Sequence, residues 1–111
     1  VTHLIGDLKD RHVLIIDDMI DTAGTTVNAA TAAKENGAKS VTAIATHAIL
    51  SGPAVERIKE SNISNLIVTD TLEIPEDKKM EQMKIITVSQ IFGQAIQRIH
   101  TGESVSALFE F

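Results

Sequence analysis

The sequence contains no cysteine, tryptophan or tyrosine, and aromatic residues make up only 3% of it. Without cysteine there is no disulfide framework and no thiolate metal site, so a reducing compartment such as the cytoplasm is expected. The scarcity of aromatic residues removes base-stacking platforms, and a net charge of -5 argues against a nucleic-acid surface, which needs clustered Lys and Arg. No apolar run is long enough to span a bilayer. We therefore expect neither nucleic acid nor a membrane as a partner.

The length of the chain limits the number of domains. Its 111 residues, 43% of them hydrophobic, suffice for one domain with a real core but not for two. The chain begins at Val1 rather than at Met, directly in an apolar segment over residues 2–5 that looks like a strand. We therefore expect residues 1–111 to form a single C-terminal domain of a longer protein.

Apolar runs alternate with helix-forming segments. The run Val13–Ile16 is unbroken, which is typical of a central strand buried on both faces of a parallel sheet. Ser51 and Ser89 are candidate helix caps, and Gly37 and Gly102 stand where helices would end. In chain order we predict a strand at 13–16, a helix at 26–36, a strand at 41–46, a helix at 51–61, an exposed connection at 72–83 between strands at 66–69 and 84–88, and a helix from 89 to 102.

This order of elements predicts the fold class. Strands that alternate with helices indicate an α/β fold, with a mostly parallel sheet, flanking helices and right-handed crossovers. The arrangement is Rossmann-like, but no Gly-x-Gly-x-x-Gly follows a strand, so the dinucleotide signature is absent.

Two unlike groups of residues follow the first predicted strand. Asp17 and Asp18 stand at its carboxyl end, where ligands of such sheets bind, and they can accept hydrogen bonds from sugar hydroxyls directly or through Mg²⁺. The next segment offers backbone N–H groups and hydroxyls for a phosphate at the start of a helix. Its residues are Asp21, Thr22, Ala23, Gly24 and Thr25. A phosphorylated sugar is the ligand that uses both groups.

Each group also has a plainer interpretation. The acid pair can simply end a strand, and residues 21–25 can be an ordinary helix start. The loop lacks the Lys and the spacing of a nucleotide P-loop, which favours a monophosphate such as the 5-phosphate of ribose 5-phosphate. A role for Asp21 beside a phosphate does not follow from the sequence, and His47 is more simply structural or solvated.

The motif Asp17–Thr25 resembles the phosphoribosyl-diphosphate (PRPP) binding motif, in the form found in ribose-phosphate diphosphokinases (PRPP synthetases). Residues 45–54 and 104–109 also resemble these synthetases. The resemblance implies a phosphoribosyltransferase-like fold. It also implies a part in transferring diphosphate from ATP to ribose 5-phosphate, which gives PRPP and AMP for nucleotide biosynthesis, with Mg²⁺ as cofactor.

The resemblance further implies regulation and assembly. The segment Ser104-Val105-Ser106 and the later Phe109 are similar to the part of the synthetases that receives phosphate or ADP at a subunit interface, in a cytoplasmic homohexamer. From residues alone, this segment is an extended tail docked by its apolar side chains. In the family, the catalytic Lys/Arg loop and most of the ATP site come from preceding sequence. We therefore expect no catalytic residue in this chain, which alone should bind ribose 5-phosphate weakly and be inactive.

Two alternatives stay open. A phosphoribosyltransferase uses a similar loop, but it would need a base-binding hood that nothing in the sequence suggests. A regulatory homologue of the synthetase that has lost catalysis usually has a degraded acid pair or loop, and here both are intact.

Overall fold

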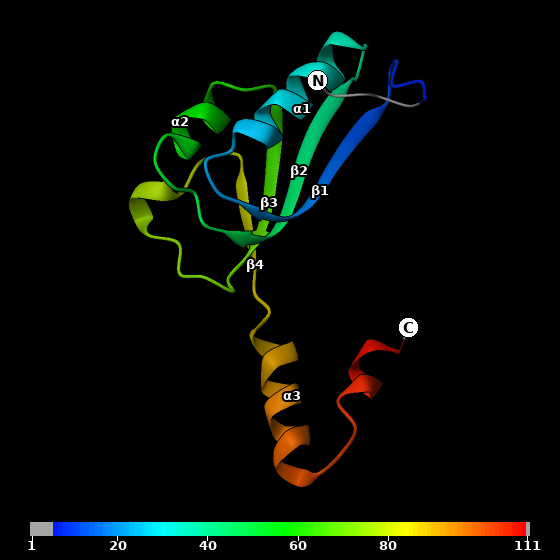
Figure 1. Cartoon of the computed structure of the whole chain (residues 1–111), viewed down its shortest axis with the longest axis vertical. Coiled ribbons are helices and arrows are strands. Elements are labelled where there is room, and N and C mark those ends of the chain that lie inside the picture. Colours follow the sequence, from blue (N-terminus) through cyan, green and yellow to red (C-terminus); the bar gives the residue numbers. More distant parts are fainter. Residues whose placement is uncertain (1–5, 111) are drawn as a thin grey trace.

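The computed structural model describes residues 6–110, so the apolar segment predicted at 2–5 lies outside it. Four strands and three helices alternate as the sequence predicted (Figure 1). Their bounds are β1 (His12–Ile20), α1 (Gly24–Glu35), β2 (Ser40–Ala48), α2 (Ala54–Lys59), β3 (Ile63–Thr69), β4 (Met83–Ile86) and α3 (Ser89–Thr101), with short 3₁₀ turns η1 (Glu76–Lys78) and η2 (Ser106–Phe109).

The strands form one parallel sheet in the order β1-β2-β3-β4. Aliphatic residues stand side by side across it, as in the row Ile16, Ile44 and Ile67. Because parallel neighbours need a crossover between them, α1 and α2 lie over the sheet. The predicted α/β fold with a parallel sheet and flanking helices is confirmed.

The prediction that Val13–Ile16 is a central strand buried on both faces is wrong. β1 is an edge strand, and it continues to Ile20, so Asp17 and Asp18 lie within it rather than beyond its end. Leu14 and Ile16 are 59% and 73% exposed because they project from the face that α1 and α2 do not cover. An unbroken apolar run therefore did not mean burial on both faces.

The core lies between the sheet and the two helices that cover one of its faces, α1 and α2. α1 packs on β1 and β2 and also meets α2. Small side chains on α1, Ala30 and Ala33, are fully buried and let the helix lie close to the strands. Larger buried side chains complete the core: Ile20, Val41, Leu50, Ile58, Leu66 and Val68.

The helix ends partly follow the predicted signals. Gly37 and Gly102 both adopt the left-handed conformation, with φ of 90° and 77°, just after the last helical residues, as predicted. Neither Ser51 nor Ser89 caps a helix with its side chain. The Ser51 hydroxyl donates to the Asp21 carboxylate instead, and the Ser89 N–H donates to the Thr87 hydroxyl at 3.1 Å.

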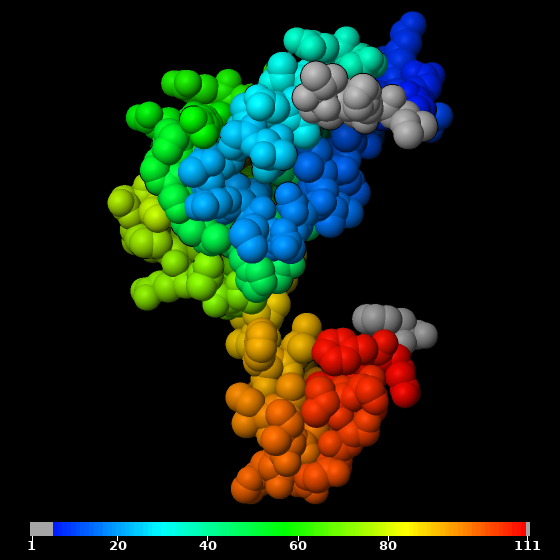
Figure 2. Space-filling view, in the orientation of Figure 1, coloured from blue at the N-terminus to red at the C-terminus, as the bar shows by residue number. Residues whose placement is uncertain are grey.

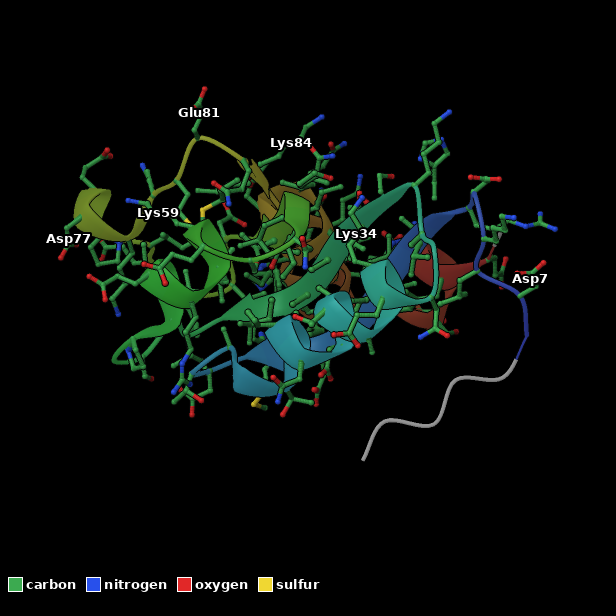
Figure 3. All side chains as sticks on the ribbon, turned by 90° about the horizontal axis from the view of Figure 1, so that it is seen from above. Asp7, Lys34, Lys59, Asp77, Glu81 and Lys84 are labelled. Atoms are coloured by element: carbon green, nitrogen blue, oxygen red, sulfur yellow. The ribbon has the colours of Figure 1, made fainter. Side chains whose placement is uncertain are left out.

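Two segments near the C-terminus differ from expectation. The connection at 72–83 is not wholly exposed, because Ile74 and Met80 are buried against the core. The tail predicted as extended contains η2 instead. Charged side chains such as Glu81 and Lys84 project outward from the layer (Figure 3).

The last part of the chain stands apart from the sheet. α3 and η2 contact each other and form an arm that extends beyond β4, away from the rest of the described chain, which we call the body. A single stretch of backbone joins the arm to the body (Figures 1 and 2). None of the side chains of α3 is buried. Its apolar face is exposed and consists of Ile91, Phe92, Ile96 and Ile99. In the part of the chain described, none of the helices has the length and apolar character needed to cross a membrane.

Candidate functional site

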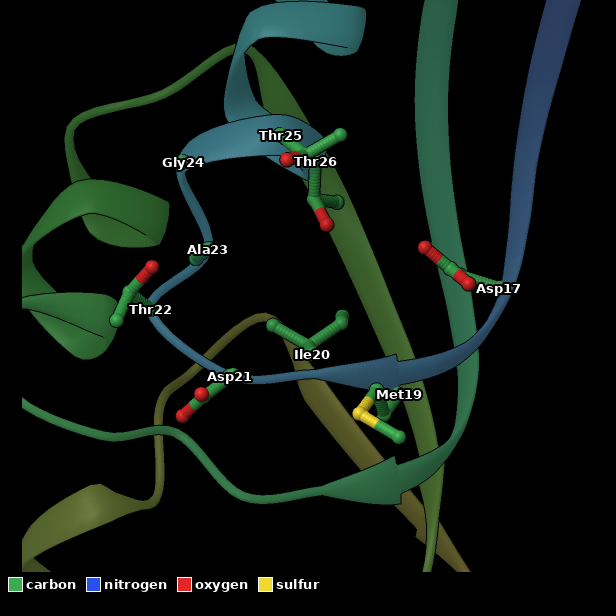
Figure 4. Close-up of a pocket in the computed structure, with 9 residues that line it drawn as sticks. All are labelled: Asp17, Met19, Ile20, Asp21, Thr22, Ala23, Gly24, Thr25 and Thr26. Carbon is green, nitrogen blue, oxygen red and sulfur yellow. The ribbon is translucent and has the colours of Figure 1, made fainter.

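A hollow of about 190 Å³ lies where β1 passes into α1, and it is lined by Asp17 and residues 19–26 (Figure 4). The loop predicted to bind phosphate, Asp21–Thr25, forms most of its wall. The loop singled out in the sequence thus lines a cavity, and its binding of phosphate stays a prediction. Among residues 6–110, no Lys or Arg lines the hollow.

Unsatisfied backbone donors mark the start of α1. Within residues 6–110, the backbone N–H groups of residues 22–26 donate to no protein acceptor, and the first helical bond at this end runs from Val27 N–H to the Ala23 carbonyl at 3.0 Å. The first turn of α1 carries no acidic residue that would compete for these donors. Free amides at the positive end of a helix form an environment that suits a phosphate.

The loop is strained at one residue. Ala23 has φ of 67° and is buried, although the left-handed conformation is unfavourable for a residue with a Cβ. Such conformations persist where surrounding contacts fix them, and they are concentrated at ligand sites. Ala23 thus allows the chain to turn sharply from the strand into the helix.

Asp21, to which the sequence assigned no role, is held by Ser51. The Ser51 hydroxyl donates to the Asp21 carboxylate, and the Ser51 N–H donates to the Asp21 carbonyl at 2.9 Å. In Figure 4 the Asp21 side chain points away from the start of α1. This pairing gives Ser51 a partner in the loop in place of the predicted helix-capping role.

The two adjacent carboxylates are separated by the alternation of the strand. Asp17 lines the hollow, and its side chain points toward the loop (Figure 4). Asp18 follows it within β1 and does not line the hollow, because successive strand side chains point to opposite faces. The Asp18 N–H donates to the Asp17 carboxylate at 2.8 Å. Only one acid of the predicted pair thus faces the loop.

The residues available for Mg²⁺ are few. Within the described residues, no group of three or more His, Asp or Glu side chains is arranged to hold a metal ion. Mg²⁺ is commonly held by only one or two carboxylates together with substrate phosphates. Asp17, next to the free amides of residues 22–26, fits that kind of shared site, whereas a cage made of protein ligands alone does not fit.

His47 has a structural partner. Its Nδ1 lies 2.8 Å from the Thr71 hydroxyl, and the side chain is half-buried. Thr71 also reaches the Thr46 carbonyl, at 3.3 Å. His47 therefore ties the end of β2 to the segment after β3.

Asp70 is a residue that sequence reasoning missed. It follows β3, and its carboxylate accepts the Val88 N–H at 2.9 Å just before α3 begins. This bond, together with one from the Thr87 side chain, lowers the pKa of the Asp70 carboxyl below its ordinary value. A second hollow of about 320 Å³ lies at this junction, lined by Asp70, Thr71, Val88, Ser89 and Phe92. The signal was an Asp directly after a strand, the same pattern that drew attention to Asp17.

The residues assigned by resemblance to a regulatory site lie on the arm. The hydroxyls of Ser104 and Ser106 are 2.7 Å apart, and the Ser104 carbonyl accepts a bond from Arg98 of α3 at 3.1 Å. Val105 precedes η2, and Phe109 at its end is 60% exposed. The structure therefore groups these residues together but does not bring them to the hollow.

Comparison with known proteins places this arrangement in a family. A family model described as phosphoribosyl synthetase-associated domain matches residues 1–110. The chain belongs to this family. Among curated relatives, the chain is 54% identical over 110 residues to a ribose-phosphate pyrophosphokinase of Chlorobaculum tepidum, and 49% identical over 109 residues to that of Bacillus subtilis. These matches cover 99% and 98% of the chain, respectively.

The fold is shared with a solved structure, although the chain is much shorter than these relatives. It spans 34% of the length of both curated proteins. The crystal structure of a phosphoribosylpyrophosphate synthetase from Mycobacterium smegmatis is similar with a TM-score of 0.87 and 38% identity, over 88% of this chain and 33% of that one. The similarity to the synthetases thus extends over nearly all of the sequence and over 88% of the chain in structure.

Proposed function

We propose that this chain is the ribose-5-phosphate-binding part of a ribose-phosphate pyrophosphokinase. The observation that carries the proposal is the loop at residues 21–25, whose N–H groups have no protein acceptor, in a hollow that Asp17 also lines. A phosphate accepts bonds from such donors, and a carboxylate accepts bonds from sugar hydroxyls. The relatives named as ribose-phosphate pyrophosphokinases support the same assignment.

The chain's own part in the reaction is positioning. Loop amides and the Thr22 and Thr25 hydroxyls would seat the 5-phosphate, while Asp17 would fix the ribose and, with substrate oxygens, one Mg²⁺. The ion would neutralise charge on the transferred diphosphate. The oxygen of the sugar 1-hydroxyl would then lie in line with the β-phosphorus of ATP. Its bond to that phosphorus would form as the bond from the phosphorus to the oxygen shared with the α-phosphate breaks, so that AMP leaves and the hydroxyl proton passes to solvent. Asp18 would make only a secondary contact to the sugar, because its side chain does not line the hollow.

Among residues 6–110, no cationic side chain lines the hollow itself. Phosphoryl transfer depends on cationic groups around the moving oxygens. We therefore expect the 111-residue chain to release no AMP from ATP and ribose 5-phosphate, and we place the ATP site mainly in other sequence of the complete enzyme. Turnover by the chain alone would contradict this part of the proposal.

Assembly and regulation belong to the same proposal. Phosphate or ADP would bind at Ser104, Val105, Ser106 and Phe109. The apolar face of α3 is exposed, which favours packing of the arm against further protein in an oligomer such as a hexamer. The absence of cysteine fits a reducing, cytoplasmic location.

Titration calorimetry with ribose 5-phosphate tests the central assignment. We expect saturable binding to the complete enzyme, weaker binding to the chain alone, and no comparable binding of ribose without its phosphate. Absence of binding with and without Mg²⁺ would instead favour a regulatory homologue without substrate binding. Release of diphosphate from PRPP in the presence of a nucleobase would favour a phosphoribosyltransferase.

A further inference from the structure

The loop at residues 20–22 is held from behind by a second segment. Three consecutive carbonyl groups of the loop accept hydrogen bonds from residues 49–51 and from Arg57 of α2, which we call the brace. The bonds run from Ile49 N–H (3.0 Å) and Leu50 N–H (3.1 Å) to the Ile20 carbonyl, from Ser51 N–H (2.9 Å) to the Asp21 carbonyl, and from Arg57 Nη1 (3.1 Å) to the Thr22 carbonyl.

The geometry of the peptide bond converts this contact into a direction for the amides. In a trans peptide, the carbonyl and the following N–H point to opposite sides, and residues 6–110 contain no cis bond. Carbonyls that face the brace therefore turn the N–H groups of Asp21, Thr22 and Ala23 away from it. The hollow is lined by the loop and by none of the four brace residues, which are all within the described part of the chain.

We infer that the brace sets the direction of the phosphate-binding amides and that Arg57 is a positioning residue for the phosphate of the substrate. This inference rests on the proposed function. Arg57 lies outside the hollow, and it would control the affinity for ribose 5-phosphate through the Thr22–Ala23 peptide, whose carbonyl it binds.

The position of Arg57 makes it the most specific part of the brace. A Cβ built on Gly24 would lie 3.4 Å from Arg57 Nη1, so the guanidinium lies directly behind the loop, with its positive charge close to where a phosphate would bind. It is the only brace contact made by a side chain to a loop carbonyl, since the other three donors are backbone groups. A substitution can therefore remove it without altering the backbone.

The brace is itself strained. Leu50 is buried and has φ of 54°, an unusual conformation for a bulky residue. Its N–H and that of Ile49 share the Ile20 carbonyl. Two facing segments, one with Ala23 and one with Leu50, thus hold each other in left-handed conformations that neither would favour alone.

Steady-state kinetics of the complete enzyme test the role of Arg57. We expect Arg57→Ala to raise the KM for ribose 5-phosphate about tenfold, because a charged donor to the loop is lost. The kcat and the KM for ATP should stay within about twofold, and Arg57→Lys should recover part of the loss, since an ammonium group can still donate to a carbonyl. Lys59→Ala, which removes a positive charge from the exposed side of the same helix, serves as the matched control and should change none of these constants.

Two results would overturn the inference. One is an unchanged KM for ribose 5-phosphate in Arg57→Ala, and the other is an equal loss in kcat and in both KM values, which would indicate general structural damage. The wild-type enzyme separates this failure from failure of the proposed function. If it binds ribose 5-phosphate and Arg57→Ala binds equally well, only the brace is refuted, whereas absence of wild-type binding refutes the site itself.

Discussion

α1 and α3 are helices of nearly equal length with opposite relations between sequence and packing. α1 has little contrast between its faces, yet it buries Ala30 and Ala33 against the sheet. α3 has a continuous apolar stripe, including Phe92 and Ile96, yet none of its side chains is buried. α1 is therefore packed against the rest of the described chain, whereas the apolar face of α3 is not.

This difference shows what helical periodicity can and cannot predict. Apolar residues at helical spacing identify the face that will be buried, but they do not say which surface will bury it. For α1 that surface is in the same chain, and small side chains suffice because the helix lies close to the strands. For α3, no surface within residues 6–110 covers the apolar face.

A matched pair of isoleucines should give the largest contrast between body and arm. Ile58 is fully buried and Ile96 is 67% exposed. Ile58→Ala should lower the free energy of unfolding of the 111-residue chain by about 3 kcal/mol, because it leaves a cavity in the core. Ile96→Ala should change it by less than about 0.5 kcal/mol. Urea denaturation followed by circular dichroism measures both, and similar losses in the two variants would mean that the arm packs on the body in solution.

The fold was largely readable from the sequence, and the errors have local causes. Alternating apolar and helical segments predicted the order of elements along the chain and the parallel sheet. The edge position of β1 was not readable, because Leu14 and Ile16 resemble core residues until the open face of the sheet is seen. The helix starts were misassigned because hydroxyl groups near a helix start have other available partners, as the bond between Ser51 and Asp21 shows.

Substitutions at two glycines, one in the body and one in the arm, compare how much each region contributes to ligand binding. Gly24 lines the hollow in the body, and Gly93 lies on α3 with no atoms near its missing Cβ. Gly24→Val in the complete enzyme should raise the KM for ribose 5-phosphate about tenfold, since its branched side chain would narrow the hollow that Gly24 lines and displace the Arg57 guanidinium, whose Nη1 lies 3.4 Å from the Cβ position. The left-handed conformation is at Ala23 and not at Gly24, so steric crowding rather than backbone preference is the expected cause.

Gly93→Val is the control for this experiment. It should leave the KM for ribose 5-phosphate unchanged, because the arm does not line the hollow. An effect as large as that of Gly24→Val would mean that the arm and the loop act together in the complete enzyme. An unchanged KM in Gly24→Val would remove the phosphate assignment of the loop.

The candidate site was readable in its composition but not in its orientation. The loop at 21–25 was predicted as a phosphate site from its series of small and hydroxyl residues, and it lines a hollow. That Asp17 and Asp18 face opposite sides could not be seen without knowing that β1 continues through them. Arg57 was missed because it is far from the loop in sequence and acts through a backbone carbonyl, which leaves no motif.

Substitutions of Asp17 and Asp18 compare the contributions of two neighbouring carboxylates within the body. Asp17→Asn should weaken binding of ribose 5-phosphate about tenfold, because an amide is a poorer acceptor for sugar hydroxyls and for Mg²⁺. Asp18→Asn should have a smaller effect, since its side chain does not line the hollow. Titration calorimetry measures both affinities, and the melting temperature should change little because both side chains are exposed. Equal losses in the two variants would show that the strand end rearranges when the sugar binds.

The smallest expected effect concerns Asp70, which joins the body to the arm. Its pKa is lowered by the Val88 N–H bond and then by Thr87, so the carboxylate form contributes stability above its unfolded pKa, and this contribution is lost as the pH falls through the folded value, below about 3.9. We therefore expect the Val88 amide resonance to shift with a midpoint below that value in an acid titration followed by nuclear magnetic resonance. Asp70→Asn keeps an acceptor without a titrating group and should abolish the shift. A midpoint at or above the ordinary Asp value would mean that the bond from Val88 does not hold the arm in solution, and that body and arm are joined by the covalent chain alone.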